Sequence, residues 1–269
     1  MKIVNQSVQD YNQEAFDLLA IKKQIEKCGK VCYKSEGLIT PDSYEAFHDM
    51  ILKNRHTSVF EHGTVYLKKR VKNLIEVGYY KHFDNFYCRV NSIPDRYGKE
   101  LIFDVYITTN YRFMVEHDLL EDLKYLCEPT QYHEKRITYK LITNLQILSE
   151  ITRHRVGSYS VESTRFCNYS KGKFNNELTF IKPCWNVDER WENTMGFIED
   201  SYLRMIDAGA KPQEAAQVLP KALKTEIVMT CFESDWDKII KMRSEKVCHP
   251  QMIELMNLIK EKYEARNNK

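Results

Sequence analysis

A short stretch near the middle of the chain concentrates side chains that bind anions. Two arginines flank a histidine at Arg153–Arg155, and another arginine, Arg165, follows shortly after. Between them lie four hydroxyl side chains, Ser158, Ser160, Ser163 and Thr164. Arginine forks make bidentate bonds to phosphate, and hydroxyls complete the shell, each bond to a charged partner being worth about 1.5–3 kcal/mol. The pattern indicates a phosphate site; a solvated basic turn with a Ser-rich loop is the alternative left open.

The composition describes a soluble globular protein of 269 residues, 43% hydrophobic and 29% charged. A net charge of +2 gives no general affinity for nucleic acid or an acidic membrane, so we do not expect nucleic acid as a partner. No apolar stretch is long enough to span a bilayer, and the first residues lack the apolar core of a signal peptide. We therefore expect a cytoplasmic protein.

Cysteine and histidine spacing argues against a metal centre. The eight cysteines are scattered without a CxxC pair, so in a reducing compartment we expect buried thiols, with a catalytic cysteine as the minor alternative. The eight histidines include no HExxH motif or other paired-ligand spacing. We expect no metal site.

Hydrophobic periodicity predicts several helices and strands. Apolar residues recur at helical spacing, and Asn144 and Gly209 are typical helix caps. The expected helices are 12–30, one opened by Pro41, 118–128, one running from Asn144 toward Arg153, 188–207, a short one from Pro212 and one after Pro250. Alternation or β-branched runs predict strands at 57–69, 101–107, 137–141, 225–231 and just before Pro183.

These elements are mixed without a βαβ rhythm, which favours an α+β fold in one domain spanning 1–269. No GxGxxG or GxxxxGK[ST] loop supports a Rossmann or P-loop site. The apolar stripe of the last helix, from Met252 to Tyr263, could belong to the core or to a subunit interface.

Four motifs in order resemble the flavin-dependent thymidylate synthase family. Arg153–Arg155, seven further residues and Ser163 match its signature, and His56–His62 matches its histidine, short spacer and Phe-Glu-His. Downstream, 212–220 resembles its short helix ending in Leu-Pro, and Lys224-Thr225-Glu226 leads on to Met242-Arg243. The ordered set covers most of the chain.

The resemblance implies an α+β subunit that forms a homotetramer with shared active sites. It implies a methyltransferase that converts dUMP to dTMP, with methylenetetrahydrofolate as one-carbon donor. FAD, reduced by NADPH, would be the hydride source, and the protein would orient it. No covalent enzyme cysteine is implied, which agrees with the absence of a distinctive cysteine motif.

The resemblance also implies roles for individual residues. Those matching flavin contacts are His56, Ser58, Arg153, His154 and Arg155, the first two from a neighbouring subunit. Those matching dUMP contacts are Glu150, Arg153, Glu162, Ser163, Thr164, Arg165, Gln217 and Arg243. Arg243 is the catalytic candidate, because a guanidinium beside the uracil ring would stabilise negative charge without losing a proton.

Some positions depart from the family pattern. Val161, Gln217, Phe232 and Ser234 stand where relatives often carry polar or charged contacts, and Glu150 replaces a commoner glutamine and needs a cation such as Arg153. These departures leave two alternatives open: the same fold acting on another pyrimidine nucleotide, or a non-catalytic nucleotide-binding relative.

The chain also carries an insertion before the signature, at roughly residues 70–140. Its basic and aromatic residues could bind single-stranded nucleic acid, but an elaboration packed on the same domain is favoured. The sequence assigns it no role.

Overall fold

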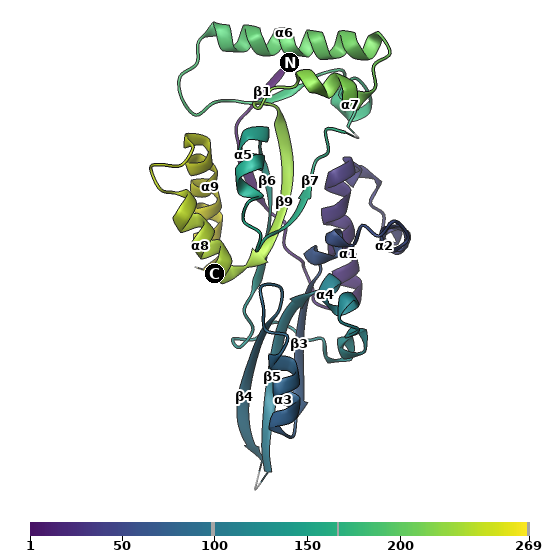
Figure 1. The fold of residues 1–269 in the computed structure, drawn as a ribbon, viewed down its shortest axis with the longest axis vertical. Coiled ribbons are helices and arrows are strands. Elements are labelled where there is room, and N and C mark those ends of the chain that lie inside the picture. The colour runs from purple at the N-terminus through teal and green to yellow at the C-terminus, as the bar shows by residue number, and fades with distance from the viewer. Residues whose placement is uncertain (98–99, 166, 268–269) are drawn as a thin grey trace.

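Three β-sheets follow one another along the long axis of an elongated molecule (Figure 1). The structure, a computed structural model, describes residues 1–97, 100–165 and 167–267. Helices and strands are mixed along the chain, which confirms the predicted α+β class. Within the described residues, no helix is both long and apolar enough to cross a bilayer.

The central sheet has four antiparallel strands and carries the signature run. Its order is β2 (Ser7–Asp10), β6 (Arg136–Asn144), β9 (Lys224–Phe232) and β7 (Ser158–Val161). The register pairs Ser158 with Thr230 and Val161 with Ile227. The signature strand β7 is therefore an edge strand held by β9.

The two faces of this sheet differ because side chains alternate along each strand. Apart from Thr143 and Thr225, the odd-numbered residues of β6 and β9 belong to an apolar cluster with α5 (Leu145–Ile151), α8 (Glu233–Arg243) and α9 (Pro250–Asn267). The even-numbered face is mostly polar, and its cover comes from the segments just after α1 (Leu18–Gly29) and α2 (Ser43–Asn54). Figure 1 shows α8 and α9 on one side of this sheet and α1 and α2 on the other.

A second sheet forms the lower end of the molecule in Figure 1. It has the order β3 (Thr64–Val71), β5 (Glu100–Asn110) and β4 (Arg89–Tyr97), all antiparallel. With α3 (Leu74–Lys81) and α4 (Tyr111–Glu116), it shares one apolar core with α1 and α2. This shared core joins the lower sheet to the rest of the chain.

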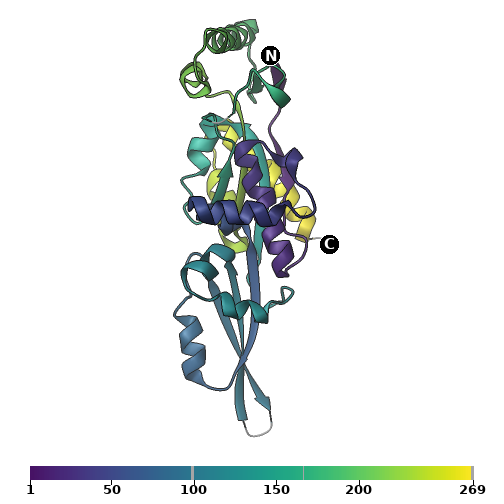
Figure 2. The same cartoon turned by 90° about the vertical axis from the view of Figure 1, so that its right-hand side faces the viewer.

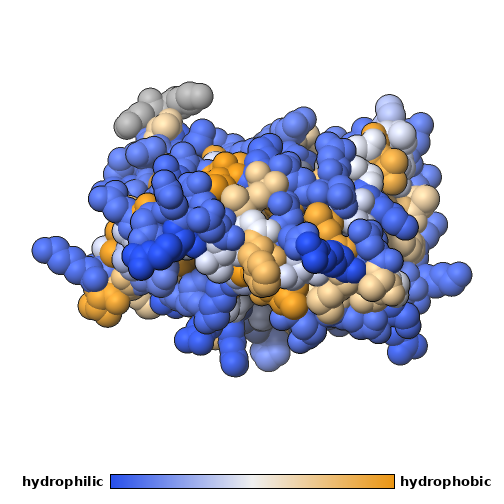
Figure 3. Space-filling model, turned by 90° about the horizontal axis from the view of Figure 1, so that it is seen from above, coloured by the Kyte–Doolittle hydropathy of each residue, from blue (hydrophilic) through white to orange (hydrophobic). Residues whose placement is uncertain are grey.

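The upper end is built on a small parallel sheet of β1 (Lys2–Val4) and β8 (Thr179–Ile181). The long helix α6 (Glu189–Asp207) lies across it with α7 (Pro212–Ala215), and the turned view shows the same three levels (Figure 2). Seen from above, this end is mostly hydrophilic with scattered apolar patches (Figure 3). The short 3₁₀ segments are η1 (Lys30–Tyr33), η2 (Glu36–Leu38), η3 (Thr57–His62), η4 (Leu120–Tyr125), η5 (Gly172–Phe174) and η6 (Ala216–Val218).

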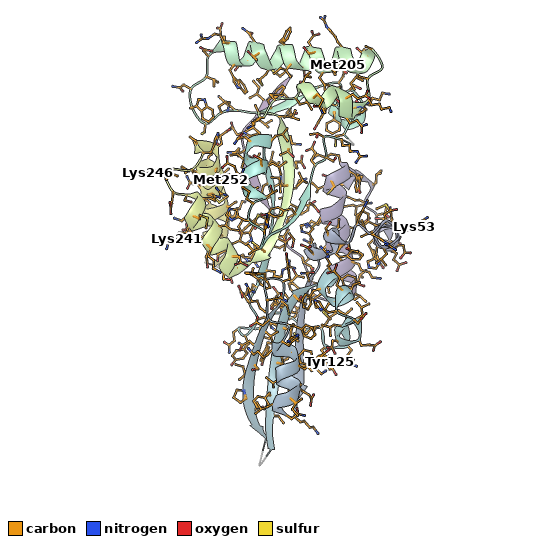
Figure 4. All side chains as sticks on the ribbon, in the orientation of Figure 1. Lys53, Tyr125, Met205, Lys241, Lys246 and Met252 are labelled. Carbon is orange, nitrogen blue, oxygen red and sulfur yellow. The ribbon has the colours of Figure 1, made fainter. Side chains whose placement is uncertain are left out.

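Several local predictions are confirmed. The helix predicted at 188–207 is α6, with Asp188 as its N-cap, and Gly209 follows it with a φ of 95°, the left-handed conformation expected at a C-terminal cap. The stripe of α9 from Met252 is buried against the sheet, so it belongs to the core of the chain. Figure 4 shows Met252 on the sheet side of α9, while Lys241 and Lys246 lie on the outer side of this helical pair.

Other local predictions are wrong. Residues 57–69 are not one strand, because η3 occupies Thr57–His62 and β3 begins only at Thr64. The predicted helix at 118–128 is the 3₁₀ segment η4. Both segments are short, and over so few residues the spacing of apolar side chains does not distinguish a 3₁₀ turn from a strand or an α-helix.

The predicted insertion, 70–140, begins inside β3 and ends inside β6. Its first basic residue is paired, since Arg70 Nε lies 2.8 Å from Asp104 Oδ1, and Lys68, just before the insertion, has its Nζ 3.3 Å from Asp104 Oδ2. Basic residues that are paired with carboxylates in this way weigh against the alternative that the segment binds single-stranded nucleic acid. That this segment is an addition to a family domain remains our proposal.

Replacing Asn144 with alanine is expected to lower the free energy of unfolding by about 2 kcal/mol. Its Oδ1 accepts the amide of Ile147 at 2.9 Å, and its Nδ2 donates to Gln251 Oε1 at 2.8 Å, both buried. Urea unfolding would measure the change. The matched control is Asn73→Ala, an exposed cap on α3 that should cost less; equal losses would contradict the buried contribution.

Candidate functional site

The signature run straddles the edge strand β7. Arg153, His154 and Arg155 lie in the turn between α5 and β7, and Ser163 to Arg165 lie in the turn that follows β7. Because β7 separates them, the two basic groups stand at opposite ends of this strand. One turn cannot therefore contain both groups, and the chain presents two separate candidate positions for an anion.

At the α5 end, the signature meets the end of α8. Arg243, the last residue of α8, donates from Nε to His154 Nε2 at 2.8 Å and from Nη2 to the carbonyl oxygen of Glu150 at 3.3 Å. Burial, and then the charge of Arg243, lower the pKa of His154. A neutral imidazole that accepts at Nε2 carries its proton on Nδ1. Three predicted residues thus come together: His154 and the carbonyl oxygen of Glu150 orient the guanidinium of Arg243.

Arg153 and Arg155 are exposed beside this cluster. Among the described residues no ion pair involves either guanidinium. Free, adjacent arginine forks are the donors that a diphosphate needs. This donor set fits the diphosphate of a flavin dinucleotide.

At the other end of β7, a turn carries the predicted phosphate ligands. Ser163 Oγ accepts the amide of Arg165 at 3.3 Å, and the Ser163 amide donates to the carbonyl oxygen of Cys32 at 3.2 Å. Arg165 is exposed, Ser163 and Thr164 are half-buried, and the side chain of Glu162 is buried beneath them. The turn therefore carries two hydroxyl side chains and an exposed arginine above an internal carboxylate.

Two hydroxyls of the run do not belong to an accessible phosphate site, which corrects the sequence interpretation. Ser158 and Ser160 are buried on the even face of β7. Ser160 Oγ lies 3.0 Å from His62 Nε2, and Arg136 Nη2 donates to Ser158 Oγ at 3.5 Å. The alternation of the strand turns both side chains inward, whereas a loop would have exposed them.

His62 links the Phe-Glu-His motif to the signature strand. Its ring contacts Ser160 on β7 and, through Nδ1 at 2.8 Å, Thr230 Oγ1 on β9. Burial, and then the charge of Arg136, lower the pKa of His62 to about 3, so the ring is neutral at pH 7. This motif therefore has a structural tie to the signature within one chain.

Three predicted residues are not brought to either end of β7 by described contacts. His56 and Ser58 are exposed at the start of η3, and Gln217 is exposed on η6 at the upper end of the molecule. Their assignments as flavin and nucleotide contacts stay predictions. For His56 and Ser58, the resemblance implied a site on a neighbouring subunit, and their exposure is compatible with it.

The departures from the family pattern have structural explanations in part. Glu150 does not form an ion pair with Arg153 in the described chain; Gln146 Nε2 donates to Glu150 Oε1 at 2.9 Å instead. Phe232 is buried with the guanidinium of Arg89 over its ring, and Ser234 Oγ donates to Glu134 Oε1 at 2.5 Å. Both of these side chains thus make contacts within the chain itself, with Arg89 and Glu134.

Sequence reasoning missed the residues beneath the turn after β7. Lys34 and Lys224 lie 3.3 and 3.0 Å from Glu162 Oε2, and both also contact Glu226. The motif Lys224-Thr225-Glu226 was visible, and alternation on a strand would have put its two charged residues on one face. No signal linked Lys34 to them. Among the described residues, no group of three or more potential metal ligands stands together.

Comparisons with known proteins point to the family that the sequence motifs resemble. A family model described as "Thymidylate synthase complementing protein" matches residues 133–266. A flavin-dependent thymidylate synthase from Pyrococcus furiosus is 31% identical over 86 residues, 30% of this chain and 34% of that protein. One from Geobacter sulfurreducens is 28% identical over 82 residues, 30% of this chain and 35% of that protein. The chain thus spans about a third of the length of the curated relatives it matches.

A solved structure, Thymidylate Synthase X (ThyX) from Helicobacter pylori with FAD and dUMP, is 13% identical with a TM-score of 0.41. The alignment covers 94% of this chain and 91% of that one.

Proposed function

We propose that the chain is a flavin-dependent thymidylate synthase, because its residues 133–266 match the family model of the thymidylate synthase complementing proteins. It converts dUMP to dTMP, with methylenetetrahydrofolate as one-carbon donor and NADPH as the source of reducing equivalents. The names of the two curated relatives support this proposal.

One observation carries the proposal: Arg243 Nε lies 2.8 Å from His154 Nε2. This contact joins the signature to a residue at the end of α8, although the two are far apart in sequence. An isolated solvated basic turn would not need a neutral histidine to orient a second guanidinium. The arrangement supports a built binding site over the alternative of a surface charge run.

Each group of residues has a distinct role in this proposal. FAD, when bound, supplies hydride chemistry that amino-acid side chains cannot perform. Arg153 and Arg155 bind its diphosphate, and Ser163, Thr164 and Arg165 bind the phosphate of dUMP. Arg243, held by His154 and the Glu150 carbonyl, stabilises negative charge on the pyrimidine while staying protonated.

The two ends of β7 require partner copies for a complete site. His56 and Ser58, exposed on η3, would reach the flavin of a neighbouring subunit, and Gln217 would contact the nucleotide. We therefore propose a homotetramer with shared active sites. Size-exclusion chromatography with light scattering tests this assembly.

Turnover with dUMP, dCMP and UMP, compared side by side in the presence of FAD, NADPH and methylenetetrahydrofolate, tests the substrate. We expect a methylated product from dUMP alone. Turnover of only another nucleotide would favour the related enzyme suggested by Val161 and Gln217. No turnover and no FAD binding would favour a non-catalytic relative, the alternative suggested by Phe232 and Ser234.

Replacing Arg155 with alanine should weaken FAD binding by about 10- to 100-fold, because one charge-assisted contact to the diphosphate is lost. Fluorescence titration of the apoprotein with FAD measures the change. Lys246→Ala is the control, because Lys246 is exposed beyond the end of α8 (Figure 4). Equal FAD affinity in Arg155→Ala and wild type would refute this assignment.

A further inference from the structure

A layer of charged side chains lies beneath the turn that follows β7. We call it the buried charge layer, and its members are Lys34, Lys140, Lys224, Glu36, Glu162 and Glu226. The side chains come from the even faces of β6 and β9, from the end of β7 and from the segment after η1. Three lysines and three glutamates give a formal charge of 3 − 3 = 0.

Glu162 is the most deeply buried member, with 1% of its side chain exposed. Its Oε2 lies 3.0 Å from Lys224 Nζ and 3.3 Å from Lys34 Nζ. A buried carboxylate is costly unless cations and hydrogen bonds compensate it. Two ammonium groups therefore determine where this carboxylate lies.

Glu226 connects the same two lysines. Its Oε1 accepts from Lys224 Nζ at 2.6 Å and contacts Lys34 Nζ, while its Oε2 lies 2.7 Å from Lys140 Nζ. The Glu162 amide also donates to the Glu226 carbonyl oxygen at 2.8 Å. Glu162 is thus held by both its backbone and its side chain.

Lys34 reaches this layer from a constrained backbone. Its φ is 51°, in the left-handed region that non-glycine residues rarely adopt. The segment before it carries the Cys32 carbonyl oxygen that accepts the Ser163 amide at 3.2 Å. The end of η1 therefore supports the turn in two ways, through a backbone bond to Ser163 and through an ion pair to Glu162.

We propose that Lys34 is a positioning residue: its ammonium group holds Glu162 and thereby orders the turn Ser163–Arg165, where the proposed function places the dUMP phosphate. The layer is formally neutral, so Lys34 acts on the geometry of the turn and adds little attraction for an anion. The inference rests on the proposed function for the identity of the ligand.

The main test is Lys34→Met, a change that removes the ammonium group and keeps a long side chain. We expect dUMP affinity of the FAD-loaded protein, measured by calorimetry, to fall at least tenfold, with FAD affinity changed less than twofold. In turnover, KM for dUMP should rise in the same proportion and kcat should change little. The matched control is Lys2→Met. Lys2 is exposed and lines one surface pocket together with Lys34, and its replacement should leave all four values unchanged.

A double variant, Lys34→Met with Glu162→Gln, separates positioning from stability. Lys34→Met alone leaves the buried layer with an unpaired negative charge, which should lower the melting temperature. The double variant removes one charge of each sign, so the layer stays neutral and the melting temperature should return toward the wild-type value. The dUMP affinity should stay at least tenfold weaker, because the anchor of the turn is still missing. Wild-type affinity in the double variant would overturn the proposal, and this comparison holds even if the single variant does not fold.

Hydrogen exchange of residues 162–165 tests positioning without any ligand. We expect these amides to exchange at least tenfold faster in Lys34→Met than in wild type, while α9 exchanges at the same rate. If wild-type protein does not bind dUMP, the proposed function fails, and the exchange result alone decides the role of Lys34. Unchanged exchange at 162–165 would overturn it.

Discussion

Replacing Arg243 with alanine is expected to lower the rate of dTMP formation by about 10²–10³-fold, the usual effect of removing one donor that stabilises transition-state charge. Flavin should remain bound, because the proposed diphosphate ligands Arg153 and Arg155 are untouched. The rate of dTMP formation and the visible absorbance of the purified variant measure the two properties.

The geometry around Arg243 explains why the loss should fall on kcat. Its guanidinium is held by His154 and by the Glu150 carbonyl oxygen, so it is oriented before substrate binds. Arg243→Lys keeps a charge but cannot make the same two bonds from a planar fork, and we expect an intermediate rate.

Lys241→Ala is the matched control, because Lys241 is exposed on the same helix (Figure 4). It should keep the wild-type rate. Arg243→Ala with unchanged turnover would refute the catalytic assignment, and loss of flavin from this variant would reassign Arg243 to cofactor binding.

Replacing Glu226 with glutamine is expected to lower the free energy of unfolding by about 3 kcal/mol at pH 7. The change leaves Lys34, Lys140 and Lys224 without the carboxylate that all three contact. Denaturant unfolding monitored by circular dichroism measures the loss. Glu177→Gln is the control, because Glu177 is 42% exposed and its partner, the N-terminal amine, also pairs with Glu199 at 2.9 Å.

The same carboxylate predicts a pH dependence. Burial by itself would raise the pKa of Glu226, but the charges of Lys224 and Lys34 outweigh it and hold the pKa well below its ordinary value of 4.5. A lowered folded-state pKa gives stability that is complete above 4.5 and declines as pH falls below it toward the folded value.

The stability difference between wild type and Glu226→Gln should therefore shrink as the pH is lowered from 5 to 3. A difference that is constant over this range would show that Glu226 acts through packing and not through its charge.

The sequence predicted the elements whose signals are local. The cap at Asn144, the cap at Gly209 and the start of α9 at Pro250 depend on residues within one helical turn, and all three are confirmed. The alternation at 137–141 and the β-branched apolar run at 225–231 likewise predicted two strands, which lie in the central sheet. Such patterns need no knowledge of distant parts of the chain.

Features that depend on pairing between distant segments were not predictable in this way. The strand β7 forms because residues 158–161 pair with β9, and without that pairing its serines resemble a polar loop. Lys34 belongs to the site only because η1 packs beneath the turn after β7. The resemblance implied separate ligand contacts for Glu150, His154 and Arg243, and the structure adds the hydrogen bonds that connect Arg243 to the other two.

Anaerobic absorbance spectroscopy tests whether flavin, reductant and dUMP meet at one site, as we propose. Purified protein would be mixed with FAD and then with NADPH, with and without dUMP. We expect a flavin spectrum that bleaches faster when dUMP is present. A protein that stays colourless after FAD is supplied, or a bleaching rate that dUMP does not change, would contradict it.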